Sequence, residues 1–569
     1  MAYTPPVDHE REPSREIMTR QAGTVAAAVL GSRVLGLIRE QVFAIVFGAG
    51  RELDAFITAF RIPNLLRDLF AEGALSAAFV TTFSQTLVRS GEGAAWRLAA
   101  LVINALTLVV GTLTVIGILA APAIVAWIAP GFAVIPGKTA LTIEMTRIMF
   151  PFILLVALAA VVMGVLNSRN VFGIPASASS FFNLGSILGG LGCAYVLAPE
   201  FIRVAVGLGG PDGATSRGTE AAARAITGMA IGTLLGGALQ LAIQLPALRA
   251  VGFRYRPLFR FSDPALRRVL LLMGPATLGA AAVQVNVLVN NNFASYLGNG
   301  PVSWLNVAFR FMQLPIGLFG VAISFVALPM VSRHVAREDH TATRRTVADA
   351  LEFAVFFSLP AACGLVLLGE PIIGLIYEHG RFSVLDTTQA ARALAAYAGG
   401  LVAYAGVKIL APAFYALDDA RTPARVSVVS IVVNYALNWT LVRALHFGHV
   451  GLALSTSTVA TVNFLWLFLL LRRRLGGIEG ARLARTFVRL AGAAATMSVA
   501  VAVVDRLLAP MLATSSTGRT LGYALRVIAG MLVGVPVFAG AAELLGVGAP
   551  LRSLLRGRRR RATPSPPAA

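Results

Sequence analysis

Charged side chains interrupt the first two long apolar stretches of the chain. They are Arg33, Arg39, Glu40, Asp54, Arg61, Arg67, Asp68 and Glu72. A charge at the centre of a bilayer costs about 2.5 to 3.5 kcal/mol on insertion scales, so such residues face a cavity or pair with one another. Guanidinium groups bind phosphate oxygens in bidentate fashion. Several arginines around one water-filled cleft would therefore form a site for a phosphorylated anion.

Helical spacing separates pairing residues from candidate ligands. Asp54, Arg61 and Asp68 recur every seven residues and share one stripe of a helix. An ion pair that fixes helix packing explains Arg61 with Asp54 as well as a functional role does. The predicted gating or ion-pairing residues are Asp54, Arg61 and Glu72. The predicted substrate-binding residues are Arg33, Arg39, Arg67 and Arg310, the last from a later apolar stretch.

Polar side chains on later stretches give weaker signals. The candidates for cavity lining are Gln284, Asn286 and Asn290, which could equally bridge helices. The weak candidates for sodium ligands are Asn434, Asn438 and Thr458, although isolated amides and threonines within spans more often join helices. The six histidines form no pair at metal-ligand spacing within a span, and no GxxxxGK[ST] loop occurs. Neither metal catalysis nor ATP hydrolysis is predicted.

The elements that position these residues are apolar segments of membrane-spanning length. Of 569 residues, 57% are hydrophobic and 13% charged, about half the charged share of a soluble domain. A spanning helix needs about 20 mostly apolar residues. Such segments lie at 24–47, 53–87, 98–127, 140–166, 172–197, 223–248, 269–297, 302–331, 347–369, 388–417, 424–443, 450–471, 486–508 and 521–545. The sequence predicts an all-α integral membrane protein with about 14 transmembrane helices and no soluble catalytic domain.

The net charge of +21 comes mostly from basic residues in the connections between spans, whose distribution indicates the membrane topology. Even-numbered connections and both tails hold about three times as many arginines and lysines as odd-numbered connections. Because basic residues stay on the cytoplasmic side, both termini are predicted in the cytoplasm. Anionic membrane lipids are the expected partner of the surplus, and nucleic acid is not.

An internal repeat relates the two halves of the chain. A G-x-G loop followed about ten residues later by A-F-R occurs at 48–61 and again at 298–310. The two units fall on the second and eighth segments, so they would share one orientation. Coincidence in an apolar background is the alternative. Duplication predicts a parallel repeat of six helices, a known transporter plan, with the last two segments outside it.

Several short sequence motifs resemble those of one family, MurJ (MviN), the bacterial lipid II flippases. In the first half they are SRVLG at 32–36, RE at 39–40, FGAG at 47–50, DAF at 54–56, PNLLR at 63–67 and FAEGA at 70–74. In the second half they include MGPA at 273–276, VSW at 302–304, GVA at 320–322 and LP at 328–329, then KILAP at 408–412 and TP at 422–423. The resemblance covers nearly the whole membrane region.

The resemblance implies a fold and a site. The fold is that of the MOP exporters: two six-helix lobes around a central cavity, plus two C-terminal helices that form a groove for a polyprenyl tail. By motif position, the family's functional arginines match Arg33, Arg39, Arg67 and Arg310, and its acidic residue matches Asp54. This chain departs from the family pattern at Asp68, Asn306 and Phe309.

The predicted domains follow from spans and resemblance together. They are a disordered cytoplasmic tail at 1–22, an N-lobe at 23–250, a basic cytoplasmic linker at 251–268, a C-lobe at 269–474, the lipid-tail helices at 475–548 and a basic, proline-rich tail at 549–569.

The predicted function is that of a flippase of the bacterial inner membrane. It would move lipid II, the lipid-linked peptidoglycan precursor, to the outer leaflet by alternating access, without a cofactor. An ion gradient or the membrane potential is left open as the driving force, and cell-wall synthesis proteins as further partners. The alternatives are an exporter of drugs or lipid-linked oligosaccharide with the same fold, a non-transporting scaffold of cell-wall synthesis, and a membrane-embedded glycosyl- or phosphotransferase, for which no loop is long enough.

Overall fold

In the computed structural model, the regular secondary structure of the described residues is helical. The described residues are 15–67, 75–205, 207, 217–258, 260, 262–511, 516–550 and 552. For 15–22, 75–77, 217, 272–283, 511 and 516–517 only the backbone is described. The two predicted tails, 1–22 and 549–569, therefore lie largely outside the described residues, as do Asp68 and Glu72.

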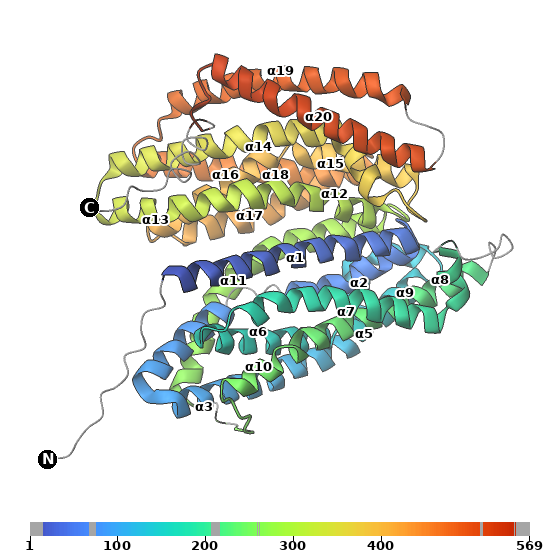
Figure 1. Ribbon diagram of the computed structural model, residues 1–569, viewed down its shortest axis with the longest axis vertical. Helices are drawn as coiled ribbons and strands as arrows, with labels where there is room; N and C mark the ends of the chain where they lie inside the picture. Colours follow the sequence, from blue (N-terminus) through green and yellow to red (C-terminus); the bar gives the residue numbers. More distant parts are fainter. Residues whose placement is uncertain are drawn as a thin grey trace. The chain divides into compact units, whose positions relative to one another are not determined.

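The helices follow one another with short connections (Figure 1). In the first half they are α1 (Arg15–Phe47), α2 (Arg51–Arg67), α3 (Leu75–Leu119), α4 (Ala121–Ile128), η2 (Pro130–Val134), α5 (Lys138–Met149), α6 (Phe152–Ser168), α7 (Gly173–Leu197), α8 (Pro199–Ala205), α9 (Arg217–Ala242), α10 (Leu245–Ala250) and α11 (Pro264–Ser295). In the second half they are α12 (Pro301–Pro315), η4 (Ile316–Val321), α13 (Ala322–Ala336), α14 (His340–Tyr377), α15 (Val384–Ala398), α16 (Leu401–Ala416), α17 (Arg421–Asn438), η5 (Trp439–Ala444), α18 (Gly448–Arg474), α19 (Gly480–Leu508), η6 (Ala509–Met511) and α20 (Ser516–Leu544).

Ten helical segments of the described residues are long and apolar enough to cross a membrane, or eleven if the bent pair α15 and α16 is one span. One of the ten, Ala78–Leu119, has 42 residues and would be about 63 Å long, roughly twice the thickness of a hydrocarbon core. Gly91 (φ 81°, ψ 175°) breaks this helix, so α3 contains the end of the second expected span and most of the third. The first and seventh expected spans fall on α1 and α11, which are not among the ten.

The described chain forms two compact units. The first unit comprises residues 1–43, 58–126 and 139–281, and the second comprises 44–57, 127–138 and 282–569. The second unit therefore includes two short pieces from the first half of the sequence. The predicted lobe boundaries, near 250 and 269, stay a prediction.

Glycines allow α7 and α9 of the first unit to lie against each other along their length (Figure 1). A Cβ added at Gly232 would lie 2.2 Å from the backbone of Gly190, and one at Gly228 would lie 2.4 Å from Ala194 N. Gly228, Gly232 and Gly236 recur every four residues and share one face of α9. Small residues at this spacing are typical of close helix crossings in membranes, where dispersion replaces the hydrophobic effect.

Two apolar clusters hold the second unit together. One joins α13, α14, α16 and α18, and the other joins α14 to α19 and α20. Large apolar side chains on the outer faces of α19 and α20 stay exposed, including Val488, Val499, Leu521 and Leu532. Continuous apolar exposure of this kind is typical of a surface that contacts lipid.

Candidate functional site

The first turn of α2 places a carboxylate at the start of α12. Asp54 lies in that turn and its side chain is fully buried. Its Oδ1 accepts hydrogen bonds from Ser303 N–H (2.9 Å) and Ser303 Oγ (2.6 Å), and its Oδ2 accepts one from Gly300 N–H (2.7 Å). The first N–H groups of a helix have no partner within it and favour an anion. Asp54 therefore caps α12 from 246 residues earlier in the chain.

Lys138, the first residue of α5, is the cationic partner of Asp54. Its Nζ donates to Asp54 Oδ2 (3.0 Å), Asn299 Oδ1 (3.0 Å) and Gly298 O (3.3 Å). Neither charged side chain is exposed. Since all three ammonium donors have acceptors, the pair meets the condition under which buried charges are tolerated. We call Asp54, Lys138 and residues 298–303 the Asp54 clamp.

Connections from distant parts of the chain meet around the Asp54 clamp within the second unit. The Arg381 N–H donates to the Ile45 carbonyl (2.9 Å), so the end of α1 lies against the connection between α14 and α15. A Cβ added at Gly48 would lie 2.5 Å from the Arg381 carbonyl oxygen. On η2, Gly131 N–H donates to Ser295 Oγ (3.1 Å) at the end of α11. Backbones this close leave no room for a side chain, which explains the glycines.

The partner of Asp54 differs from the one that its helical spacing suggested. Arg61 recurs seven residues after Asp54 but belongs to the first unit, whereas the bonded cation is Lys138. By sequence, Lys138 falls in an odd-numbered connection, between the third and fourth expected spans. The sequence feature that could have singled out Lys138 is its residue type, because it is one of two lysines in an arginine-rich chain. An ammonium has three donors and fits a small closed site in which the five donors of a guanidinium could not all be satisfied.

The predicted arginines of the first unit lie on α1 and α2. Arg33 is exposed, and Arg67 is half-buried at the end of α2. The Arg39 guanidinium lies 5.1 Å from the centre of the Phe182 ring, and its Nη2 is 3.8 Å from Glu40 Oε1. A cation–π contact of this kind orients a guanidinium without removing its charge. That these arginines bind substrate stays a prediction.

Arg310 lies half-buried on α12 in the second unit. Its neighbours in sequence are held by aromatic contacts: Phe309 packs edge-on against Tyr397 at 5.4 Å, and Phe311 against Tyr377 at 6.0 Å. Phe309, one of the departures from the family pattern, thus fixes the rotation of α12 next to Arg310. The role of Arg310 in substrate binding also stays a prediction.

The amides predicted on α11 and α17 form one hydrogen-bonded cluster. Asn434 Nδ2 (3.0 Å) and Asn438 Nδ2 (2.8 Å) both donate to Asn290 Oδ1. Asn290 Nδ2 donates to Thr456 Oγ1 on α18 (2.9 Å), and Asn286 Nδ2 donates to a serine hydroxyl on α17. The cluster joins three helices.

Three further observations bear on the predicted sodium ligands. The Thr458 hydroxyl donates to the carbonyl of its own helix at Leu454 (2.9 Å), and Thr458 is half-buried. Within the described residues no group of three His, Cys, Asp or Glu side chains could hold a metal. Asn434 and Asn438 turn N–H groups toward Asn290, whereas sodium requires oxygens. The sodium site stays a prediction, as does a cavity-lining role for Gln284, which is half-buried on α11.

Sequence comparisons with known proteins identify the family of the chain. The sequence model of the family described as lipid II flippase MurJ matches residues 43–521. A lipid II flippase MurJ of Burkholderia cenocepacia is 36% identical over 481 residues, which cover 84% of this chain and 88% of that protein. A probable lipid II flippase MurJ of Rhizobium tropici is 34% identical over 540 residues, 94% of this chain and 96% of that protein.

Solved structures give the same picture. A structure described as lipid II flippase MurJ in an inward closed conformation has a TM-score of 0.70 and 25% identity, and covers 92% of this chain and 99% of its own. An inward-facing multidrug resistance MATE family transporter of the MOP superfamily has a TM-score of 0.63 at 16% identity, covering 79% and 96%. The second likeness concerns the fold alone. The family resemblance predicted from the sequence is confirmed, as is an all-helical membrane fold like that of MurJ and MATE transporters.

Proposed function

Since the chain belongs to the lipid II flippase MurJ family, we propose that it carries lipid II from the cytoplasmic to the outer leaflet by alternating access. The family is one of transporters, so the chain is a multi-pass protein of the bacterial inner membrane and not an enzyme. The proposed topology has 14 spans, both termini in the cytoplasm, two lobes of six helices and a final pair formed by α19 and α20.

The Asp54 clamp is the outer gate in this proposal. The observation that carries it is the fully buried ion pair of Asp54 and Lys138 at the meeting point of several connections. The connections that meet there follow the first, third, seventh and ninth expected spans. All are odd-numbered, so the proposed topology places all of them on the outer side. A gate closed there leaves access from the cytoplasm.

The buried ion pair of Asp54 and Lys138 suits a gate that opens and closes better than a permanent structural contact. Removing two charges from water costs several kcal/mol per ion, which the attraction between them offsets only in part. When the gate opens, Asp54 and Lys138 regain water, so closed and open states can be close in free energy. An apolar contact of the same size would keep the gate shut without this compensation.

The substrate would be held by the arginines. Arg33, Arg39, Arg67 and Arg310 bind the diphosphate in this proposal, and Gln284, Asn286 and Asn290 line the cavity. A guanidinium presents donors in a planar fork that matches phosphate oxygens. Lipid II carries a diphosphate between a sugar headgroup and a polyprenyl tail, and the proposed place for the tail is the apolar surface of α19 and α20.

A drug exporter or a scaffold is the main competing function. The likeness to multidrug transporters is limited to the fold, whereas the family model covers most of the chain. A scaffold would leave the arginines of α1 and α2 without a reason to tolerate their insertion cost.

Depletion of the protein in its bacterial host tests the function. In a host without another flippase, lipid II should stop reaching the outer leaflet, as measured by its access to an external modifying enzyme. Normal delivery during depletion would exclude the flippase function. A scaffold role predicts that delivery continues while wall synthesis fails.

Substitution of the arginines tests the substrate site. Arg33→Ala and Arg39→Ala should each abolish complementation of the depleted host at normal protein levels, because the diphosphate loses a charged ligand. Arg89→Ala is the matched control, since Arg89 is exposed on α3 outside the predicted site. Full complementation by both α1 variants would remove the site assignment without affecting the family assignment.

A further inference from the structure

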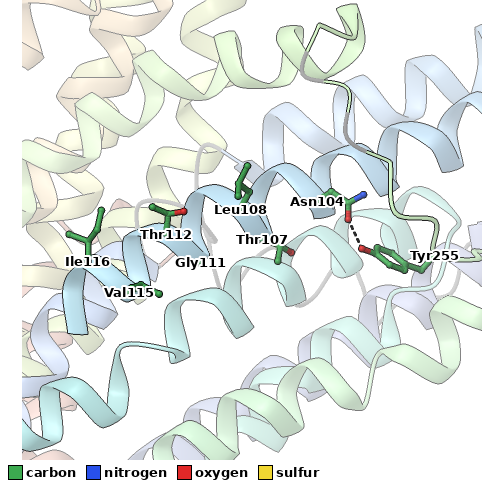
Figure 2. A pocket seen from close by; sticks show the side chains of 8 residues that line it. All are labelled: Asn104, Thr107, Leu108, Gly111, Thr112, Val115, Ile116 and Tyr255. Carbon is green, nitrogen blue, oxygen red and sulfur yellow. Dashed lines mark hydrogen bonds between the residues drawn. The ribbon is translucent and has the colours of Figure 1, made fainter. Parts of the chain in front are cut away.

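A groove runs along the outer face of α3 in the first unit, separate from the predicted substrate site. Its volume is about 510 Å³, and Figure 2 shows its lining. The lining residues are Asn104, Thr107, Leu108, Gly111, Thr112, Val115, Ile116 and Tyr255. Seven of them recur at spacings of three and four along α3, so they form one face of the helix. Tyr255 alone comes from the basic linker and lies at the Asn104 end.

The groove has the length and the surface that suit one acyl chain. From Asn104 to Ile116 the helix rises about 18 Å, close to the ~15 Å depth of one leaflet's hydrocarbon layer. Leu108, Val115 and Ile116 are more than half exposed along it. A Cβ added at Gly111 would have no atom within 4 Å, so the absence of a side chain there leaves open space.

Hydrogen bonds fix the linker at one end of the groove. Asn104 is buried, and its Nδ2 donates to the carbonyls of Leu258 (2.8 Å) and Arg256 (3.3 Å). The Tyr255 hydroxyl donates to Asn104 Oδ1 (2.6 Å), as Figure 2 shows. Arg254 and Arg256 are exposed on either side of this tyrosine, and neither forms an ion pair with a residue that the structure describes. Positive charge therefore stands at one end of an apolar groove.

We propose that this groove binds an anionic phospholipid of the cytoplasmic leaflet. One acyl chain lies along α3 between Asn104 and Ile116, and the phosphate-bearing headgroup lies at Arg254 and Arg256. A tyrosine with an apolar ring and a polar hydroxyl suits the level between headgroup and chain. The leaflet assignment rests on the proposed topology, in which residues 251–268 form a cytoplasmic connection. The binding of the lipid does not depend on transport.

Photo-crosslinking to the full chain in nanodiscs tests the proposal. The probes are phosphatidylglycerol and phosphatidylcholine, each with a diazirine on one acyl chain, and peptide mapping locates the label. Phosphatidylglycerol should label residues 104–116 and phosphatidylcholine should not. The variant R254Q/R256Q should lower the apparent affinity about 30-fold, because each basic residue near a membrane surface contributes about fivefold. Gly111→Leu should abolish the label by filling the groove.

Matched controls separate the site from general surface charge. The variant R333Q/R337Q removes two exposed arginines at the end of α13 and should leave the label unchanged. Equal labelling by phosphatidylcholine, or unchanged labelling of R254Q/R256Q, would overturn the proposal. Loss of the label on adding polyprenyl diphosphate would overturn it too, since the groove would then hold the substrate tail. Because the readout is labelling, failure of the transport assay would not affect it.

Discussion

At the scale of residues, the central feature is the buried ion pair of Asp54 and Lys138. Asp54 makes three hydrogen bonds to the start of α12 and one to Lys138, while Lys138 has two further acceptors on residues 298–299. The sequence alone made Asp54 a candidate for gating or ion pairing, because a carboxylate in an apolar stretch needs a partner. It could not supply the partner, since Lys138 and Gly300 reach Asp54 only through the folding of distant connections.

Removal of the ammonium should destabilise the protein more than removal of the pair. Lys138→Met leaves a buried carboxylate with no cation, and the expected loss is about 3–5 kcal/mol. The double variant D54N/K138M should recover part of that loss, measured by thermal unfolding in detergent as a double-mutant cycle. Lys408→Met, at the other lysine, is exposed and should change stability by less than about 0.5 kcal/mol. A stability of Lys138→Met equal to the wild type would contradict the clamp.

Two glycines next to the clamp provide a matched pair of substitutions. Gly298 (φ 91°) and Gly300 (φ 106°) both adopt a left-handed conformation, so alanine at either costs about 1–3 kcal/mol. At Gly300 an added Cβ would also lie 2.4 Å from the Trp304 ring, which a bond from its Nε1 to Asp386 holds in place, whereas at Gly298 nothing lies within 4 Å. Gly300→Ala should therefore unfold at a lower temperature than Gly298→Ala; the reverse order would show that the ring moves freely.

At the scale of elements, apolar length predicted most of the spans. The segments expected from the fourth to the fourteenth span correspond to helices of the structure. All except the seventh meet the length and hydropathy needed to cross a membrane, the tenth as the bent pair α15 and α16. The end of the second expected span and most of the third appear in one helix, α3, because the chain bends at Gly91 with no intervening loop. Helices α1 and α11 are not among the ten helical segments that meet these criteria, and for residues 15–22 of α1 and 272–283 of α11 only the backbone is described.

The contact between α7 and α9 predicts that two Gly→Ala substitutions change the stability of the protein in opposite directions. Gly232→Ala adds a methyl group 2.2 Å from the Gly190 backbone and should cost about 1–3 kcal/mol, because neither backbone can move aside cheaply. Gly192→Ala on α7 meets no atom within 4 Å and should stabilise by about 0.4–1 kcal/mol, since alanine restricts the unfolded chain. Thermal unfolding of both variants checks this, and a stabilising Gly232→Ala would contradict the close packing.

At the scale of the whole molecule, segments from the first half of the chain pack with the second half. The compact units show that residues 44–57 and 127–138 pack with the second half of the chain. The sequence could predict two repeats but not this exchange, because the G-x-G motif shared by 48–50 and 298–300 indicates duplication and does not show which connections pack together. In the proposed cycle these two segments separate from residues 298–303 and 378–383 when the outer side opens.

A disulfide across the gate tests this cycle most directly. The Arg381 N–H donates to the Ile45 carbonyl (2.9 Å), so these two residues lie next to each other and are the positions for a cysteine pair. The pair I45C/R381C is introduced with Cys193 and Cys363 replaced by alanine. Oxidation should stop delivery of lipid II to the outer leaflet, and reduction should restore it, while each single cysteine remains active. Undiminished delivery with the pair fully crosslinked would contradict the account.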